Sequence, residues 1–320
     1  MRSNGFIIAL FAAILLAYLF PSLLTALPLD TIIDIGIGLI FFFYGLKLAP
    51  SELKAGFFNY RAHLLIQSVT FLLFPLLTFI FIPLFEGGTR SDLWIAIFFL
   101  GVLPSTVSSS VVMVAIAKGN LPTAIFNASI SGLIGIIVTP LWLSLFMAPS
   151  GDFAIGDVIT KLLLQIVLPL ITGLLLQRFL GNFARSHNRK LTLFDKSVIV
   201  LIVFSSFSNS FKSNLFDTIE LVDLVKLALI VIALFFSIYF IIGYICKLMN
   251  FSLENTITAK FAGTKKSLVH GSVMAKIIFG GSASMGLFLL PIMIYHILQL
   301  LIIAVFAERY RKQLLKNETL

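Results

Sequence analysis

Charged side chains are scarce in this 320-residue sequence, and cysteine occurs only once. Asp, Glu, Lys and Arg make up 12% of the chain, against about 25% in an average soluble domain, and 59% of the residues are hydrophobic. The lone Cys246 excludes an intramolecular disulfide and a cysteine-based metal cluster. The motifs G-x-x-x-x-G-K-[ST], H-E-x-x-H and G-x-S-x-G are also absent, which argues against ATP-driven transport and against an intramembrane enzyme. The composition therefore predicts an all-α polytopic membrane protein.

Ten apolar segments are long enough to cross a hydrocarbon core of about 30 Å. They span residues 5–27, 29–49, 64–85, 92–117, 121–147, 157–180, 195–215, 220–248, 255–279 and 283–307. With the N-terminus inside, fifteen of the 23 basic residues fall on the inner side, four on the outer side and four within the ninth segment. Because cytoplasmic loops carry excess Lys and Arg, this split predicts a multi-pass protein of the cell (inner) membrane with both termini cytoplasmic. It also explains the net charge of +9 without a nucleic-acid partner.

The ten segments divide into two sets of five, residues 1–150 and 151–320. Since five is odd, the second set would enter the membrane from the opposite side, as in transporters built from inverted repeats. The fourth and ninth segments are the most polar and least regular of their halves. They share a weak pattern at a constant offset of 158, in which Ser105, Thr106, Ser109 and Lys118 correspond to Gly263, Thr264, Ser267 and Lys276. Both segments are predicted to be broken helices that meet at mid-membrane.

The ninth segment places several basic residues and glycines where a membrane helix is expected: Lys260, Gly263, Lys265, Lys266, His270, Gly271 and Lys276. A lysine at the bilayer centre costs about 2.5–3.5 kcal/mol, so such residues usually face a polar cavity. Lys265 and Lys266 are adjacent and point in different directions, so only one of them is expected to face it. The alternative is that both reach the cytoplasmic surface. His270 follows Lys266 by one turn, as a site residue or as a partner of a helix carbonyl.

Neutral oxygen ligands are concentrated in the fourth segment, which has five hydroxyl residues in six positions beside Pro104. This density favours a binding site, although small hydroxyl residues also allow close helix packing. Asn127 and Ser131 lie four residues apart in the fifth segment and so share a helix face. Gln67 is either an interfacial cap or a ligand. Single polar residues such as His296 are predicted to form interhelical hydrogen bonds, and no carboxylate is placed securely inside a segment.

Four stretches together resemble the bile acid:sodium symporter (BASS) family, and most closely its SBF-like branch of sodium–bile acid cotransporters. They are F-F-F-Y-G-L-K-L-A-P-S-E-L-K-A-G (41–56), L-P-S-T-V-S-S-S…A-K-G-N (103–120), F-N-A-S…T-P (126–140) and F-A-G-T-K-K-S-L…G-S-V-M-A-K (261–276). The resemblance covers essentially the whole chain. It implies ten transmembrane helices in two inverted repeats, with helices 4 and 9 broken and crossing. Helices 1, 2, 6 and 7 would form a panel domain, and helices 3–5 and 8–10 a core domain.

The resemblance also implies two sodium ions beside the crossing and substrate between the domains, but the sequence departs from the family's ligand pattern. A Ser-Asn pair of the fourth helix is replaced by Ser109-Ser110, or by Ser110-Val111 if the register is counted from Asn120. Hydroxyl ligands of the fifth helix fall near Ala124 and Ala128, so that Asn127, Ser129 or Ser131 would have to serve. The family's shared glutamate falls around Thr264–Lys266, where this chain has no carboxylate.

Two coupling hypotheses follow from the missing glutamate. In the first, the ammonium of Lys265 or Lys266 replaces at least one ion, and coupling is to protons or is absent, because burial makes a lysine easier to deprotonate. In the second, a sodium site survives on neutral oxygens from Gln67, Ser109, Ser110, Asn127 and Ser131, and Na⁺ is the one cofactor.

The sequence therefore predicts a secondary active, symporter-type transporter of a small organic anion that works by alternating access in the lipid bilayer. Substrate and coupling would involve Thr106, Asn127, Thr264, Lys265, Lys266, Ser267 and His270. A non-transporting membrane regulator built on the same fold is the alternative function. The sequence predicts neither the substrate's identity nor the oligomeric state.

Overall fold

The computed structural model describes residues 3–48, 54, 56–106, 108–147 and 155–318. Within these ranges the regular structure is entirely helical. Seven helical runs are long and apolar enough to span a membrane: 29–47, 60–84, 121–147, 156–186, 188–212, 221–248 and 285–314. Two shorter apolar helices, at 5–19 and 92–102, accompany them. These helices are those of a polytopic membrane protein.

The elements follow one another along the chain with few long connections. In order they are α1 (Ser3–Leu19), α2 (Leu29–Lys47), α4 (Tyr60–Ser68), η1 (Val69–Leu73), α5 (Phe74–Thr78), η2 (Phe79–Leu84), η3 (Gly88–Arg90), α6 (Asp92–Val102), α7 (Ser108–Ile116), α8 (Leu121–Met147), α9 (Ile155–Leu162), η5 (Leu163–Val167), α10 (Leu168–Ser186), α11 (Asn188–Lys212), η6 (Leu215–Thr218), α12 (Leu221–Leu248), α13 (Leu253–Gly263), α14 (Leu268–Phe279) and α15 (Met285–Glu318).

Several helix ends differ from the predicted segment limits. The first helix ends at Leu19, two residues before Pro21, and not at residue 27, because proline cannot continue the hydrogen-bond ladder. The polar stretch predicted as the loop 181–194 is helical except for a break at His187. Polarity marks where a helix leaves the membrane, but it does not end the helix. Hydropathy therefore ended the sixth segment too early and began the seventh too late.

Two helical runs are interrupted in the middle of the molecule. After α6, residues 103–106 are not helical, and Leu103 is extended because it precedes Pro104 and is therefore disfavoured in the helical region. Between α13 and α14, residues 264–267 are not helical, and Ser267 caps α14 by accepting a hydrogen bond from the amide of His270 at 3.2 Å.

The two interruptions are joined by direct hydrogen bonds. The Ser267 amide donates to the carbonyl of Pro104 at 2.9 Å, and the Ser105 hydroxyl donates to the carbonyl of Ala262 at 2.7 Å. The Ser110 hydroxyl lies 3.3 Å from the carbonyl of Phe261. Helix ends leave backbone groups without intrahelical partners, and here each interruption supplies partners to the other.

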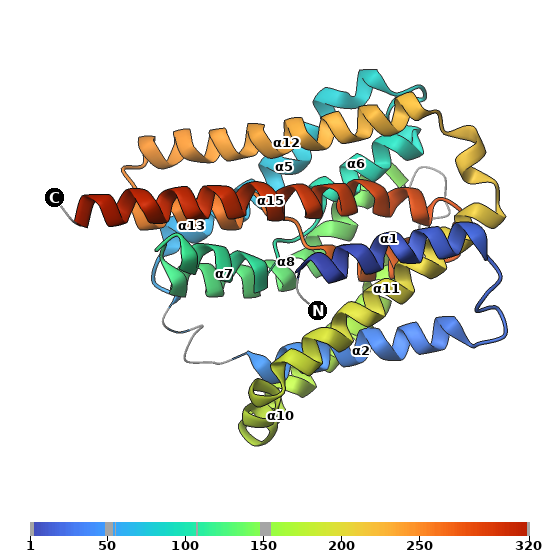
Figure 1. The fold of residues 1–320 in the computed structure, drawn as a ribbon, viewed down its shortest axis with the longest axis horizontal. Helices are drawn as coiled ribbons and strands as arrows, with labels where there is room; N and C mark the ends of the chain where they lie inside the picture. Colours follow the sequence, from blue (N-terminus) through green and yellow to red (C-terminus); the bar gives the residue numbers. More distant parts are fainter. Residues whose placement is uncertain (1–2, 49–53, 55, 107, 148–154, 319–320) are drawn as a thin grey trace.

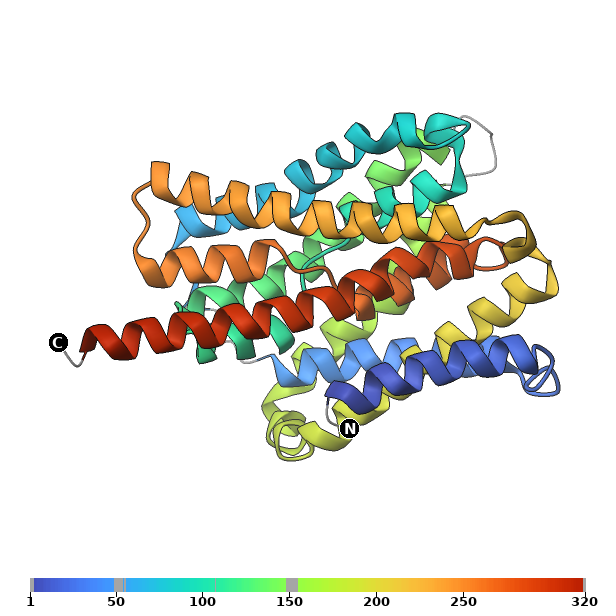
Figure 2. The same ribbon diagram turned by 45° about the horizontal axis from the view of Figure 1, so that its top comes forward.

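The helices form two groups that are visible in both ribbon views. Helices α1, α2, α10 and α11 lie together on one side, while α12, α13 and α15 run along the other (Figures 1 and 2). The contact of α2 with α10 is a backbone contact at Gly45 and Gly173. A Cβ added to Gly45 would lie 2.3 Å from the Leu170 carbonyl oxygen, and one added to Gly173 would lie 2.2 Å from that of Phe42. Small residues allow such close packing in membranes.

Candidate functional site

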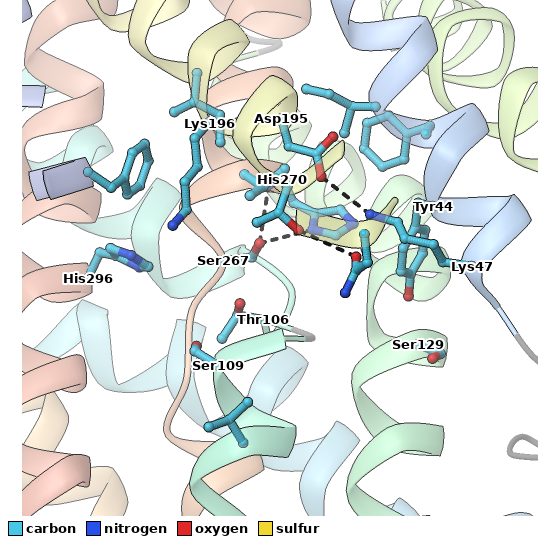
Figure 3. A pocket seen from close by; sticks show the side chains of 18 of the residues that line it. Tyr44, Lys47, Thr106, Ser109, Ser129, Asp195, Lys196, Ser267, His270 and His296 are labelled. Carbon is cyan, nitrogen blue, oxygen red and sulfur yellow. Dashed lines mark hydrogen bonds and ion pairs between the residues drawn. The ribbon is translucent and has the colours of Figure 1, made fainter. Parts of the chain in front are cut away.

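A cavity of about 530 Å³ lies between α2 and α11 on one side and the two interruptions on the other. Its wall is apolar over much of its area, with Phe6, Ile40, Phe41, Val112 and Met113 among the lining residues. Figure 3 shows the polar side chains that surround it. They are Tyr44, Lys47, Thr106, Ser109, Ser129, Asn188, Thr192, Asp195, Lys196, Ser267, His270 and His296. An apolar wall with a few convergent polar groups is typical of a small-molecule site.

The charged residues of the cavity come from α2 and α11. The Lys47 ammonium lies 3.5 Å from Asp195 Oδ2, and the Lys196 ammonium lies 5.3 Å from the centre of the Phe6 ring (Figure 3). Asp195 Oδ1 is buried and accepts no hydrogen bond within the part of the chain that the structure describes. Two lysines against one aspartate leave the cavity with a net positive charge, which favours an anionic ligand.

Asp195 was not predicted as a site residue. It was expected at the first position of a segment, with the acidic residues almost wholly in loops. Because α11 begins at Asn188, Asp195 lies two turns inside the helix and faces the cavity. Asp195 thus lies inside a helix, although the sequence analysis placed no carboxylate securely inside a segment.

We expect Lys47→Met to destabilise the protein by about 1 kcal/mol, because it leaves the Asp195 carboxylate partly buried and without its cation. The double variant Lys47→Met, Asp195→Asn is expected to recover most of this loss. Melting temperatures of the two variants and of Asp195→Asn would measure the coupling between the residues. Additive effects would contradict an energetic link between them.

The two adjacent lysines of the second interruption point to different partners, and both are buried. The Lys265 ammonium donates to Ser109 Oγ at 3.1 Å, and Ser109 lines the cavity. The Lys266 ammonium points away from the cavity, toward the end of α6 and toward η1. Lys265 is therefore one hydrogen bond from the cavity, whereas none of the three hydrogen-bond partners of the Lys266 ammonium lines it.

His270 does line the cavity, but not on a common helix face with Lys266. Lys266 lies within the non-helical residues 264–267 and His270 in the first turn of α14, so the argument from one-turn spacing does not apply. The Nδ1 atom of His270 lies 2.9 Å from the hydroxyl of Ser267, and Thr106 lies beside them in the wall (Figure 3). Thr264, in contrast, donates its hydroxyl to the carbonyl of Lys260 at 2.6 Å and is not part of the wall.

The residues predicted as sodium ligands form hydrogen bonds to other groups of the protein. Gln67 Nε2 donates to Asn127 Oδ1 at 3.0 Å, and Asn127 Nδ2 lies 2.7 Å from His63 Nδ1. Ser131 Oγ accepts from the amide of Ser105 at 2.9 Å, while Ser110 donates to the carbonyl of Phe261 in α13. Gln67 Oε1 is buried and has no hydrogen-bond donor among the described residues, so it is an acceptor still available to a ligand.

Two residues of α15 form hydrogen bonds with the second interruption, and neither was predicted from the sequence as a site residue. Gln299 Oε1 accepts from the amide of Lys266 and Gln299 Nε2 donates to its carbonyl, each at 2.9 Å. The hydroxyl of Tyr295 donates to the carbonyl of Thr264. A lone glutamine in an apolar segment was the available signal, because it must find partners inside the protein.

Comparison with known proteins gives matches over nearly the whole chain. Residues 4–312 match the family described as the SBF-like CPA transporter family. An uncharacterized protein of Pseudomonas aeruginosa is 35% identical over 312 residues, which cover 97% of this chain and 93% of that protein. YfeH of Escherichia coli (strain K12), a symporter by name, is 30% identical over 311 residues, covering 97% and 93%. Sodium/bile acid cotransporter 7 of Rattus norvegicus is 28% identical over 311 residues, covering 94% and 91%.

Proposed function

The chain belongs to the SBF-like CPA transporter family and is therefore a membrane transporter and not an enzyme, and we propose that it carries a small organic anion by alternating access. The cavity between α2, α11 and the two interruptions would be the substrate site. The observation that supports this most directly is the combination of an apolar wall with two lysines and one aspartate. An amphipathic anion would place its hydrocarbon part against the wall and its charge near Lys47 and Lys196.

We further propose the membrane arrangement that alternating access requires. The chain would cross the inner membrane ten times, with both termini cytoplasmic and with residues 1–150 and 151–320 as inverted repeats. The helix group α1, α2, α10 and α11 would form the panel domain, and the remaining helices the core domain. Rocking of one group against the other would open the cavity to each side in turn. The adjacency of these four helices supports this grouping.

For the coupling ion we propose that a lysine ammonium replaces at least one sodium ion at the interruptions. Lys265 and Lys266 are buried at this position, and no ion pair joins either to a carboxylate among the described residues. Lys265, which contacts a residue of the cavity wall, would then carry a proton as the coupling ion, or transport would be uncoupled. Sodium binding near Gln67 Oε1 and Asn127 is the competing proposal.

The names of relatives suggest which anions to test first. Some relatives are named sodium/bile acid cotransporters, and cholate, a bile acid, has the amphipathic character that suits the cavity. We expect cholate, below its micellar concentration, to raise the melting temperature of the purified protein, since a ligand of the folded state stabilises it. An amphipathic cation of similar size serves as the control, and stabilisation by the cation alone would contradict an anion site.

Uptake into proteoliposomes then separates transport from binding. We expect uptake of the stabilising anion to exceed that of empty liposomes and to respond to an imposed pH gradient. Replacing sodium by potassium or choline at constant ionic strength tests the competing proposal. A strict sodium requirement would favour the neutral-oxygen site, and ligand binding without uptake would favour the non-transporting regulator.

A further inference from the structure

The ammonium of Lys266 lies in a cage of three backbone carbonyls. Its Nζ atom is 2.6 Å from the carbonyl oxygen of Gly101, 2.8 Å from that of Leu103 and 2.9 Å from that of Thr70. The ring of Phe74 adds a cation–π contact with its centroid 4.1 Å from Nζ. The Lys266 side chain is only 1% exposed.

The three carbonyls are available because of local features of the sequence. Gly101 lies in the last turn of α6, and Leu103 follows that helix before Pro104, so neither carbonyl has a helical partner along the chain. In η1 the amide of Phe74 bonds to the carbonyl of Val69, five residues back. The next bond of this kind would join residue 75 to Thr70, but Pro75 has no N–H to donate. Thr70 therefore offers a free carbonyl to the cage.

The geometry favours the protonated form of the side chain. A carbonyl oxygen only accepts hydrogen bonds, and a lysine can satisfy three acceptors only as an ammonium, which has three N–H donors. A neutral amine has two, and its lone pair would face the third oxygen. The carbonyl at the C-terminal end of α6 also carries partial negative charge, which compensates the cation where no carboxylate does.

The backbone of Lys266 is held in place as firmly as its side chain. Gln299 pairs with both its amide and its carbonyl, as described above. The side chain cannot leave the cage without breaking three hydrogen bonds, and two more bonds hold the backbone from which it extends.

We infer that the carbonyls of Thr70, Gly101 and Leu103 form a monovalent-cation site that the chain fills permanently with its own Lys266 ammonium. Three neutral oxygens suit a single positive charge, whereas divalent cations prefer more oxygens and carboxylates among them. If the proposed transport function holds, no ion would be exchanged at this site, and Lys265 alone of the two lysines would be free to couple transport to an ion.

Removal of the side chain should convert the cage into a site for a free ion. We expect Lys266→Ala to melt at a lower temperature than wild type in choline chloride. Ammonium chloride at the same ionic strength should restore about 2–4 °C in a saturable manner, since ammonium offers the same donors at the same distances. Wild type should not respond. Lys260→Ala is the matched control, because Lys260 contacts Tyr310 and Tyr239 and no carbonyl cage, and it should not respond either.

A second variant decides the matter if Lys266→Ala does not fold. Lys266→Met fills similar volume without charge and should be clearly less stable than wild type, with no response to ammonium because its side chain occupies the cage. A Lys266→Met protein as stable as wild type would overturn the inference, as would a Lys266→Ala protein whose melting temperature does not respond to ammonium, potassium or sodium.

If neither variant accumulates, ¹⁵N NMR of wild type with labelled lysine side chains decides. A slowly exchanging ammonium signal at pH 7 supports the cage, and its absence contradicts it. None of these readouts uses transport, so a failure of the proposed function would not affect them.

Discussion

Replacing Lys265 with methionine is expected to slow substrate uptake at least about tenfold, a loss of about 1.4 kcal/mol in transition-state stabilisation, without lowering the melting temperature. Lys265 is fully buried, and the one hydrogen bond of its ammonium within the described chain goes to Ser109. A buried charge with so few partners is costly to fold, so an uncharged side chain of similar length should be tolerated or should stabilise. A residue that costs stability but is needed for uptake would be acting in the transport cycle.

The ion dependence of uptake distinguishes a coupling role for Lys265 from a role in binding. If Lys265 carries the coupling proton, an imposed pH gradient should accelerate uptake by wild type and not by Lys265→Met. Other titratable groups face the same cavity, namely Tyr44, Lys47, Asp195, Lys196, His270 and His296. His270→Gln and His296→Gln, tested in parallel, should keep the response to the gradient. Lys260→Met controls for the loss of a nearby lysine, in α13. Uptake by Lys265→Met within twofold of wild type, with the same gradient response, would contradict the proposal.

The positions of the two helix interruptions could be predicted from the sequence, because their causes are local. Pro104 forces the residue before it out of the helical region, and a run of small and charged residues follows Gly263. The direction in which the side chains of Lys265 and Lys266 point could not be predicted from the sequence. It depends on the dihedral angles of residues 264–267, where neither helical nor strand periodicity applies, and on free carbonyls more than 160 residues away in the chain. The periodicity of helices and strands gives no prediction of side-chain direction for residues outside regular structure.

The cavity was predicted only in part for a related reason. Thr106, Ser109, Ser267 and His270 stood out because they are polar within apolar segments, and they line the cavity. Lys47 and Asp195, 148 residues apart, were placed near segment ends, where charged residues are usually solvated. Their pairing depends on how α2 packs against α11, and a single sequence carries no signal for that packing.

The packing of α2 against α10 gives the second large effect that we expect. Gly45→Ala and Gly173→Ala should each lower the melting temperature strongly, because the added Cβ would lie 2.2–2.3 Å from a backbone oxygen of the other helix. A backbone cannot rotate away as a side chain does, so the helices must separate at a cost of about 1–3 kcal/mol or more. The matched control is Gly38→Ala on α2, where the nearest atom is a proline ring carbon at 3.8 Å, an ordinary contact.

The same substitutions should also weaken the cavity, since α2 carries Tyr44 and Lys47 beside Gly45. We expect Gly45→Ala to lose most of the stabilisation by cholate and Gly38→Ala to keep it. The double variant Gly45→Ala, Gly173→Ala should be less destabilised than the sum of the single variants, because the first Cβ has already separated the helices. Melting temperatures of Gly45→Ala and Gly173→Ala equal to that of Gly38→Ala would show that α2 and α10 do not meet backbone to backbone.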